Sequence, residues 1–396
     1  MPAGMKVKLN NAALLRWARE SSGYGLDEIA RSLRKHPETI LAWESGEDAP
    51  TYPQLRDFAA KVKRPLAALF LPEVPPELPA PVDYRAKSGE RAGRYTAETL
   101  LAVRMLRNSL SELRALLEGL RQSLVFSMPR WASSTDPVAR AREMRSELEI
   151  TLEAQMGWKT AAQAFEAWRS VLFDRGVLVQ VLDMPLEDAR GFSVLENDLV
   201  LGGIAVSREE GAREARIFSV FHEVAHLCLR SPGVSGLLVE DLGAKPTAVE
   251  RLEVYCNHFA NAFLLPRDHP AVIDAAHSVA QDFTAETALQ YAHQFNVSKD
   301  VLARTALYLG FITPQTYQAE TEQWRAQYRE TAANSEKVRG WGSSEAKKKV
   351  GRLGKGYVAA VLQAWDRDML SAYEVSNLLS LGLRHLDEAR SLVVGR

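Results

Sequence analysis

The chain has 396 residues, enough for two or three domains with sizeable cores. Lysine and arginine total 49, and aspartate and glutamate total 50. The net charge of −1 excludes a global basic field for nucleic acid, so any DNA contact needs a local patch. The two cysteines lack a paired spacing, and the chain shows neither an apolar signal region at its start nor a membrane-length apolar stretch. We therefore expect a cytoplasmic protein without membrane contact.

The first 72 residues predict a separate all-helical domain. Short apolar-periodic runs alternate with glycine and proline, and the segment carries 11 basic against 8 acidic residues, a charge of +3. Helices are expected at residues 10–20, 26–33, 37–44, 52–61 and 65–71. The stretch 26–71 resembles the helix-turn-helix of the XRE, or lambda-repressor-like, family, with Ala30 at the tight-packing position and Gly46 closing the second helix of the pair.

This resemblance implies that the start of the second helix lies in the major groove of DNA. The residues expected to face DNA are Arg34, Lys35, His36, Glu38 and Thr39. Phosphate repels Glu38 unless the carboxylate accepts a hydrogen bond from cytosine, and the turn lacks the glutamine and arginine that usually read adenine and guanine. A head used only for dimerisation or protein docking stays an alternative.

Residues 73–96 are expected to form a linker, because five prolines between residues 72 and 81 favour a stiff, extended chain. Leucines then recur at helical spacing over 97–124, which predicts one amphipathic helix that packs on the domain that follows it or on a second protomer, leaving a homodimer open. Further expected elements are a helix at 147–173, strands at 177–182, 191–195 and 199–206, and a solvated loop at 335–356. The strand at 199–206 is either an exposed edge that holds an extended peptide or an interior strand.

A metal-binding pattern occupies residues 222–226, which read His-Glu-x-x-His inside a helical stretch at 209–229. Positions i and i+4 lie one turn apart on one helix face, so His222 and His226 can reach a single metal ion. Glu223, on an adjacent face, is placed to polarise a water molecule. This spacing is typical of zinc peptidases.

A third ligand is expected from the helical stretch 248–266. Glu253 is the first candidate, and Asn257, one turn later, faces the same way and can orient a ligand histidine. The rival ligands are Glu250, Cys256 and His258.

The segments FSVFHEVAHLCL and ERLEVYCNHFANAFLLP together resemble the ImmA/IrrE family of metallopeptidases, in which HExxH is followed by an E-x-x-A-N-x-F-A-x-x-L-L-x-P element. The resemblance implies a zinc ion held by His222, His226 and Glu253. Glu223 is then the catalytic carboxylate. Cys256 stands where the family usually has alanine.

The same resemblance continues through residues 136–182 and 295–312, and it implies a minimal zincin fold. By resemblance the substrate is a repressor or related regulatory protein, whose cleavage controls stress or mobile-element genes. Tyr255 and His258 are local candidates for stabilising the oxyanion, and a residue distant in the sequence is an equal alternative.

The predicted fold is mainly α with a small mixed sheet. We expect an all-α helix-turn-helix head at 1–72, the linker at 73–96, an α+β minimal zincin-like domain with its leading helix at 97–315, and a helical C-terminal region at 316–396. The function expected is an intracellular zinc endopeptidase with a DNA-binding head. The alternative is a helix-turn-helix regulator or antitoxin-like protein whose zinc domain is structural or sensory. An intact Glu223 favours the peptidase, since structural zinc sites are commonly closed by four protein ligands.

Overall fold

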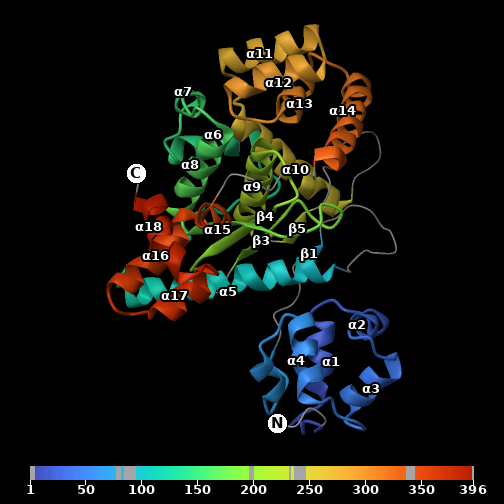
Figure 1. The fold of residues 1–396 in the computed structure, drawn as a ribbon. Coiled ribbons are helices and arrows are strands. Elements are labelled where there is room, and N and C mark those ends of the chain that lie inside the picture. The colour runs from blue at the N-terminus through green and yellow to red at the C-terminus, as the bar shows by residue number, and fades with distance from the viewer. Residues whose placement is uncertain are drawn as a thin grey trace. The chain divides into compact units, whose positions relative to one another are not determined.

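The computed structural model of the protein divides into two compact units, the first of residues 1–80 and 87–105 and the second of residues 81–86 and 106–396. The structure describes residues 5–76, 82–83, 95–195, 200–231, 233–235, 247–335 and 344–394, with side chains except at 82–83, 233–235, 325–335 and 394. Each unit is drawn as a ribbon in Figure 1. None of the described helices has the length and apolar character that crossing a membrane requires.

The first unit is built from helices, as predicted. Its elements are α1 (Ala13–Glu20), α2 (Leu26–Ser32), α3 (Pro37–Ser45), α4 (Tyr52–Lys61), the 3₁₀ helix η1 (Leu66–Phe70) and the beginning of α5 (Ala97–Gly119). The fifth predicted helix is thus a single 3₁₀ segment. Helix α3 ends at Gly46, whose φ of 81° lies in the left-handed region that glycine adopts without strain.

A buried ion pair joins α1 to α3 in this unit. The Arg19 guanidinium donates two hydrogen bonds to the Glu44 carboxylate, at 2.7 and 2.9 Å. Both residues are buried, and Arg19 Nη1 also donates to the carbonyl of Tyr24 at 3.2 Å. Apolar residues of α1 to α4 surround the pair and form a core of their own. The bidentate geometry fixes the orientation of α3 relative to α1.

The second unit contains a mixed sheet with the strand order β1-β5-β3-β4-β2. The strands are β1 (Val82–Asp83), β2 (Val177–Leu182), β3 (Gly191–Leu195), β4 (Gly202–Ser207) and β5 (Gly233–Ser235). Strand β4 runs parallel to β2 and antiparallel to β3, and β5 runs antiparallel to β3 and parallel to β1. The predicted fold class, mainly helical with a small mixed sheet, is confirmed.

The strands β2 and β3 have the predicted bounds, whereas β4 begins later than predicted. Because β4 pairs with β2 on one side and β3 on the other, it is an interior strand. The suggestion that this strand is an exposed edge for a peptide is therefore wrong. Its backbone groups are already used by two neighbours.

The remaining elements of the second unit are helical. They are α6 (Pro137–Glu147), α7 (Leu152–Met156), α8 (Ala161–Phe173), α9 (Arg213–Cys228), α10 (Ala248–Leu264), α11 (Pro270–Gln281), α12 (Ala285–Gln294), α13 (Lys299–Tyr308), α14 (Pro314–Ser335), α15 (Glu345–Leu353), α16 (Lys355–Asp366), α17 (Ala372–Leu379), η3 (Leu383–His385) and α18 (Leu386–Val394). The predicted helix at 147–173 is in fact two helices, because Thr151 and Thr160 each cap a new start. The predicted loop at 335–356 contains α15, and its residues 336–343 lie outside the described part of the chain.

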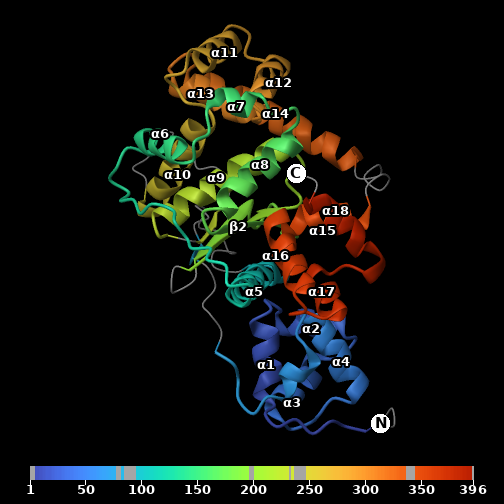
Figure 2. The same cartoon turned by 90° about the vertical axis from the view of Figure 1, so that its left-hand side faces the viewer.

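Helices cover both faces of the sheet. Helices α8 and α9 pack on one face, and α10 packs against α9 (Figure 1). On the other face, Gly203 leaves room for Leu106 and Leu110 of α5, since a Cβ there would lie 2.9 Å from the Leu110 side chain. Figure 2 shows the helices α15 to α18 gathered next to β2 and α5. Because α9 lies on the sheet and α10 packs on α9, side chains from these two helices can meet and form a site.

An aromatic cluster joins α8, α9 and α10. Phe221 of α9 stacks on Phe263 of α10 with ring centres 4.2 Å apart, and Trp168 of α8 contacts both rings, at 4.9 and 5.4 Å. All three side chains are fully buried. Each such pair adds about 0.5–1.5 kcal/mol beyond the burial of area. The cluster therefore fixes how α9 and α10 face each other.

We expect Glu44→Ala to destabilise the first unit by about 3–5 kcal/mol, because it leaves the buried Arg19 guanidinium without its buried counter-ion. The measurement is hydrogen–deuterium exchange of the full chain, with protection compared for peptides within residues 5–76. Glu20→Ala is the matched control, since Glu20 also pairs with Arg19, at 3.3 Å, but is exposed. Equal effects of the two substitutions would show that the buried pair does not hold the unit together.

Candidate metal centre

Three side chains of α9 and α10 converge in the second unit. His222 and His226 lie one turn apart on α9, and their Nε2 atoms are 3.2 Å from each other. Glu253 of α10 reaches both, with Oε2 at 3.2 Å from His222 Nε2 and Oε1 at 3.1 Å from His226 Nε2. All three residues are buried. The structure thus brings together the three residues that the sequence predicts as ligands.

Hydrogen bonds at the far side of each imidazole define which ring nitrogen faces the centre. His222 Nδ1 lies 2.9 Å from Asn257 Oδ1, and His226 Nδ1 lies 3.1 Å from the carbonyl oxygen of Ser231. Both partners accept, so each Nδ1 donates its proton, and in the neutral ring each Nε2 carries a lone pair. The two Nε2 lone pairs and the Glu253 carboxylate then face one another, and none of these three groups has a hydrogen to donate. A cation at this point satisfies all three groups.

The carboxylate of Glu253 carries a negative charge in this arrangement. Burial alone would raise its pKa, but the His222 and His226 imidazoles, when protonated, lower that pKa to about 2. Burial would lower the pKa of His222, and the nearby carboxylates of Glu253 and Glu223 raise it instead. Positive charge is therefore favoured between these groups, and a proton or a metal ion can supply it.

Glu223 is buried between α9 and β3. Its side chain lies against Gly191, where a Cβ would approach Glu223 Cγ to 3.3 Å and Oε1 to 3.5 Å. The buried Glu210 carboxylate accepts hydrogen bonds from Arg190 at 2.5 Å and from Ser219 at 2.8 Å. Arg190 precedes Gly191, and Ser219 lies one turn before Glu223. This bridge ties β3 to α9 next to the predicted catalytic carboxylate.

The rival ligand Glu250 is engaged elsewhere. Its side chain accepts a hydrogen bond from the Thr247 amide at 2.6 Å, and the Thr247 hydroxyl accepts from the Glu250 amide at 3.2 Å. This reciprocal pair is the capping box of α10. Glu250 thus stabilises the start of the helix, a turn away from the converging groups.

Cys256 is a closer rival than Glu250. Its Sγ atom and the ring nitrogens of His222 and His226 lie within 4.8 Å of one another. The Glu253 oxygens lie 3.2 Å from the His222 ring and 3.1 Å from the His226 ring, so we take Glu253 as the third group. Burial and the nearby carboxylates raise the pKa of the Cys256 thiol well above its usual range.

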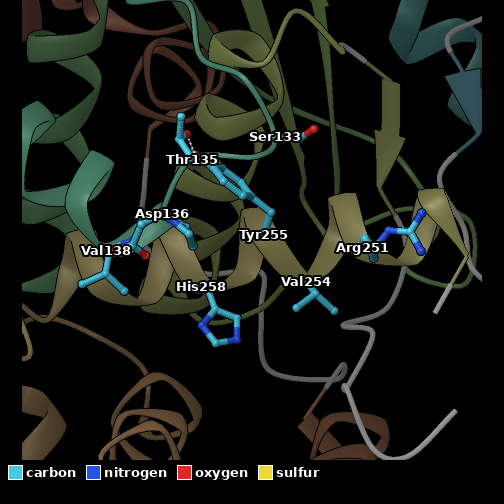
Figure 3. A pocket seen from close by; sticks show the side chains of 9 residues that line it. Ser133, Thr135, Asp136, Val138, Arg251, Val254, Tyr255 and His258 are labelled. Carbon is cyan, nitrogen blue, oxygen red and sulfur yellow. Dashed lines mark hydrogen bonds between the residues drawn. The ribbon is translucent and has the colours of Figure 1, made fainter. Parts of the chain in front are cut away.

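Tyr255 and His258 lie on a different stripe of α10 from Glu253 and Asn257. They line a cavity of about 440 Å³ shown in Figure 3. The Tyr255 hydroxyl lies 3.1 Å from Thr135 Oγ1, and the His258 ring stacks on Tyr308 with centres 4.1 Å apart. At 100° per residue both side chains point away from the converging groups. Neither is placed to stabilise an oxyanion there, so that suggestion is corrected.

The residues predicted to face DNA lie in the first unit, between α2 and α3. Arg34, at a φ of 55°, is exposed in the turn, as are His36 at the start of α3 and Glu38 in its first turn. Lys35 and Thr39 are half-buried. The five residues therefore form one continuous stretch at the surface of this unit.

Sequence reasoning missed two contributors to the centre. The Ser231 carbonyl orients His226, and a backbone acceptor leaves no trace in residue types. Gly191 gives Glu223 its space. An isolated glycine at the start of a predicted strand indicates that another group approaches the backbone closely. This signal could have predicted that a side chain of the site packs against Gly191.

Comparison with known proteins supports part of the family resemblance. No curated protein matches the chain. A peptidase family model described as the IrrE N-terminal-like domain matches residues 174–307, a range that contains β2 to β5 and α9 to α12. The matched range includes every converging residue of the centre and does not include the first unit. Residues 174–307 are thus similar to the IrrE N-terminal-like domain, which supports a metallopeptidase role for this part of the chain.

Proposed function

We propose that the protein is a zinc-dependent endopeptidase that holds its metal ion with His222, His226 and Glu253. The observation that carries the proposal is the convergence of two imidazole Nε2 atoms and a buried carboxylate within 3.2 Å, with both Nδ1 atoms committed to acceptors. The match to a peptidase family over residues 174–307 supports the same function.

The donor set favours zinc over the hard cations. Two imidazole nitrogens and one carboxylate are the protein ligands of many catalytic zinc sites, whereas magnesium and calcium prefer oxygen alone. When bound, zinc polarises a scissile carbonyl and lowers the pKa of water to near neutrality. Asn257 and the Ser231 carbonyl orient the two imidazole rings.

Glu223 performs the proton transfers in this proposal. Its carboxylate takes a proton from the attacking water and delivers it to the leaving amine. The packing of Glu223 against Gly191 restricts where the carboxylate can lie, and the Glu210 bridge holds that strand in place. These residues therefore position the proton acceptor before a substrate arrives.

The proposal includes a DNA-binding role for the first unit. Support comes from the resemblance of residues 26–71 to the XRE helix-turn-helix and from the exposure of Arg34, His36 and Glu38 around the start of α3. By the resemblance of residues 218–229 and 250–266 to the ImmA/IrrE family, the substrate is a repressor or related regulatory protein whose cleavage controls stress or mobile-element genes. DNA and this protein substrate are then the partners.

We expect His222→Ala and His226→Ala to abolish binding of one zinc ion per chain, and Glu253→Ala to weaken it strongly, because each removes a donor atom. Asn257→Ala should weaken zinc binding by about 10- to 100-fold, since it frees the His222 ring. Zinc content and affinity of the purified full chain check these effects. Glu250→Ala is the matched control on α10 and should keep the metal. Full zinc in Glu253→Ala would move the third-ligand role to another residue.

A second prediction separates metal binding from cleavage. Glu223→Gln should retain zinc and lose proteolysis, because the amide cannot accept the proton while the three donors stay in place. The measurement compares the proteomes of cells that carry the wild-type chain with those that carry the variant. Glu214→Gln, the same change at the start of α9, is the control and should behave as wild type. Identical proteomes for all three proteins would favour the structural or sensory alternative.

For the first unit, we expect the full chain to bind duplex DNA weakly and with strong salt dependence. Arg34→Ala and Lys35→Ala should lower affinity for all sequences and reduce the salt slope by about 1 each, while Thr39→Ala should change sequence preference. Arg56→Ala, an exposed charge on α4, is the control for charge alone. Fluorescence anisotropy at several salt concentrations gives these values, and no binding at low salt would leave this unit as a protein-docking module.

A further inference from the structure

Cys256 lies beside the two histidines of the proposed metal site. Its Sγ atom and the ring nitrogens of His222 and His226 lie within 4.8 Å of one another, and its side chain is fully buried. Cys256 follows Glu253 by three residues, so both side chains project from one face of α10. Two residues at this spacing on one helix serve as ligands of a single metal site in other helical proteins.

The Glu253 carboxylate gives a second, independent observation. Its Oε1 atom is buried, and its close polar neighbour, His226 Nε2 at 3.1 Å, does not lie in hydrogen-bond geometry. Such an atom in a packed interior indicates a partner of another kind, because an unpaired buried oxygen is costly. Two nitrogens, a carboxylate and a sulfur therefore surround one point between α9 and α10, and all of them are metal donors.

We propose that Cys256 is a fourth protein ligand of the metal ion, so that the resting centre is closed by His222, His226, Glu253 and the Cys256 sulfur. This inference rests on the metal site proposed above. As the sulfur–metal bond forms, the thiol proton is released to solvent. Zinc bonds of about 2.1 Å to nitrogen and about 2.3 Å to sulfur place two donors of one ion about 3.5 Å apart, so a shift on the order of 1 Å completes the site.

The consequence for the peptidase is a latent resting state. A catalytic zinc site keeps one position open for water and substrate, and the sulfur fills that position. Rotation about the Cα–Cβ bond of Cys256 withdraws the sulfur while the other three ligands stay in place, and the released thiolate regains a proton from solvent. Access to the metal is then regulated by one side chain of the same helix that supplies Glu253.

The test is X-ray absorption of the zinc-loaded full chain. We expect one sulfur at about 2.3 Å and the remaining donors at about 2.0–2.1 Å. Cys256→Ala should keep zinc, lose the sulfur signal and bind the ion about 10-fold or more weakly. Cys228→Ala is the matched control, since Cys228 is the other buried free cysteine and belongs to α9, and it should leave the sulfur signal unchanged. A wild-type spectrum with nitrogen and oxygen donors alone overturns the proposal, and this result does not depend on any variant folding.

Cobalt substitution provides an optical readout in the same proteins. A sulfur-to-cobalt charge-transfer band should be present in the wild type and in Cys228→Ala, and absent in Cys256→Ala and in Cys256→Ser, which keeps the size of the side chain. A band that persists in both Cys256 variants overturns the proposal.

Proteolysis separates this inference from the proposed function. If Cys256 closes a peptidase site, Cys256→Ala should cleave the proteins that differ between wild-type and Glu223→Gln cells faster than the wild type does at equal zinc occupancy. A wild type with bound sulfur in which neither protein cleaves supports the ligation and refutes the peptidase. A wild type without sulfur that cleaves normally supports the peptidase and refutes the ligation.

Discussion

The rotation of α9 relative to α10 is the constraint on which the second unit depends, and three aromatic rings set it. Phe221 directly precedes His222, and its stacking on Phe263 orients the neighbouring histidine toward Glu253. Trp168 adds α8 to the same contact, so the helix pair is joined to the helix that covers β2. Close-packed interiors transmit displacements of this kind to adjacent groups. The geometry of the proposed metal site is therefore an outcome of core packing that begins one residue away from it.

The hydrogen-bond acceptors at Nδ1 of His222 and His226 determine which ring nitrogen faces the centre. An amide oxygen holds one imidazole and a backbone carbonyl holds the other, so both present the same nitrogen. Ser231 lies beyond the end of α9, which means that the path of the chain after the helix takes part in orienting His226. The start of α10 is secured separately, by the pair of Thr247 and Glu250. The backbone just beyond the end of α9 thus contributes to the precision of the metal site.

Many elements of the fold and the residues of the metal site could be predicted from the sequence, and the predictions that were wrong have physical causes. The strands β2 and β3 had the correct bounds because largely apolar runs, broken only by Gln180 and Ser193, are flanked by polar residues or glycine. The break near Thr151 was missed because threonine has no strong preference for or against a helix. It starts a new helix here only because its hydroxyl caps the first turn of α7. Helical spacing favoured Glu253 as the third ligand but could not exclude Cys256, since that depends on distances to α9. The same spacing argument, applied fully, would have removed Tyr255 from consideration.

The lack of a side chain at Gly191 has a consequence for how the strands of the sheet align. Residues on a strand alternate between faces, so a slip of β3 by one position would turn Phe192 or Arg190 toward the Glu223 carboxylate. Neither side chain fits where even a methyl group is crowded. The glycine beside the proposed catalytic carboxylate therefore disfavours a one-residue slip of β3, because either neighbouring side chain would crowd the space that Glu223 occupies. Correct pairing of the strands and room for the proton acceptor are then selected together.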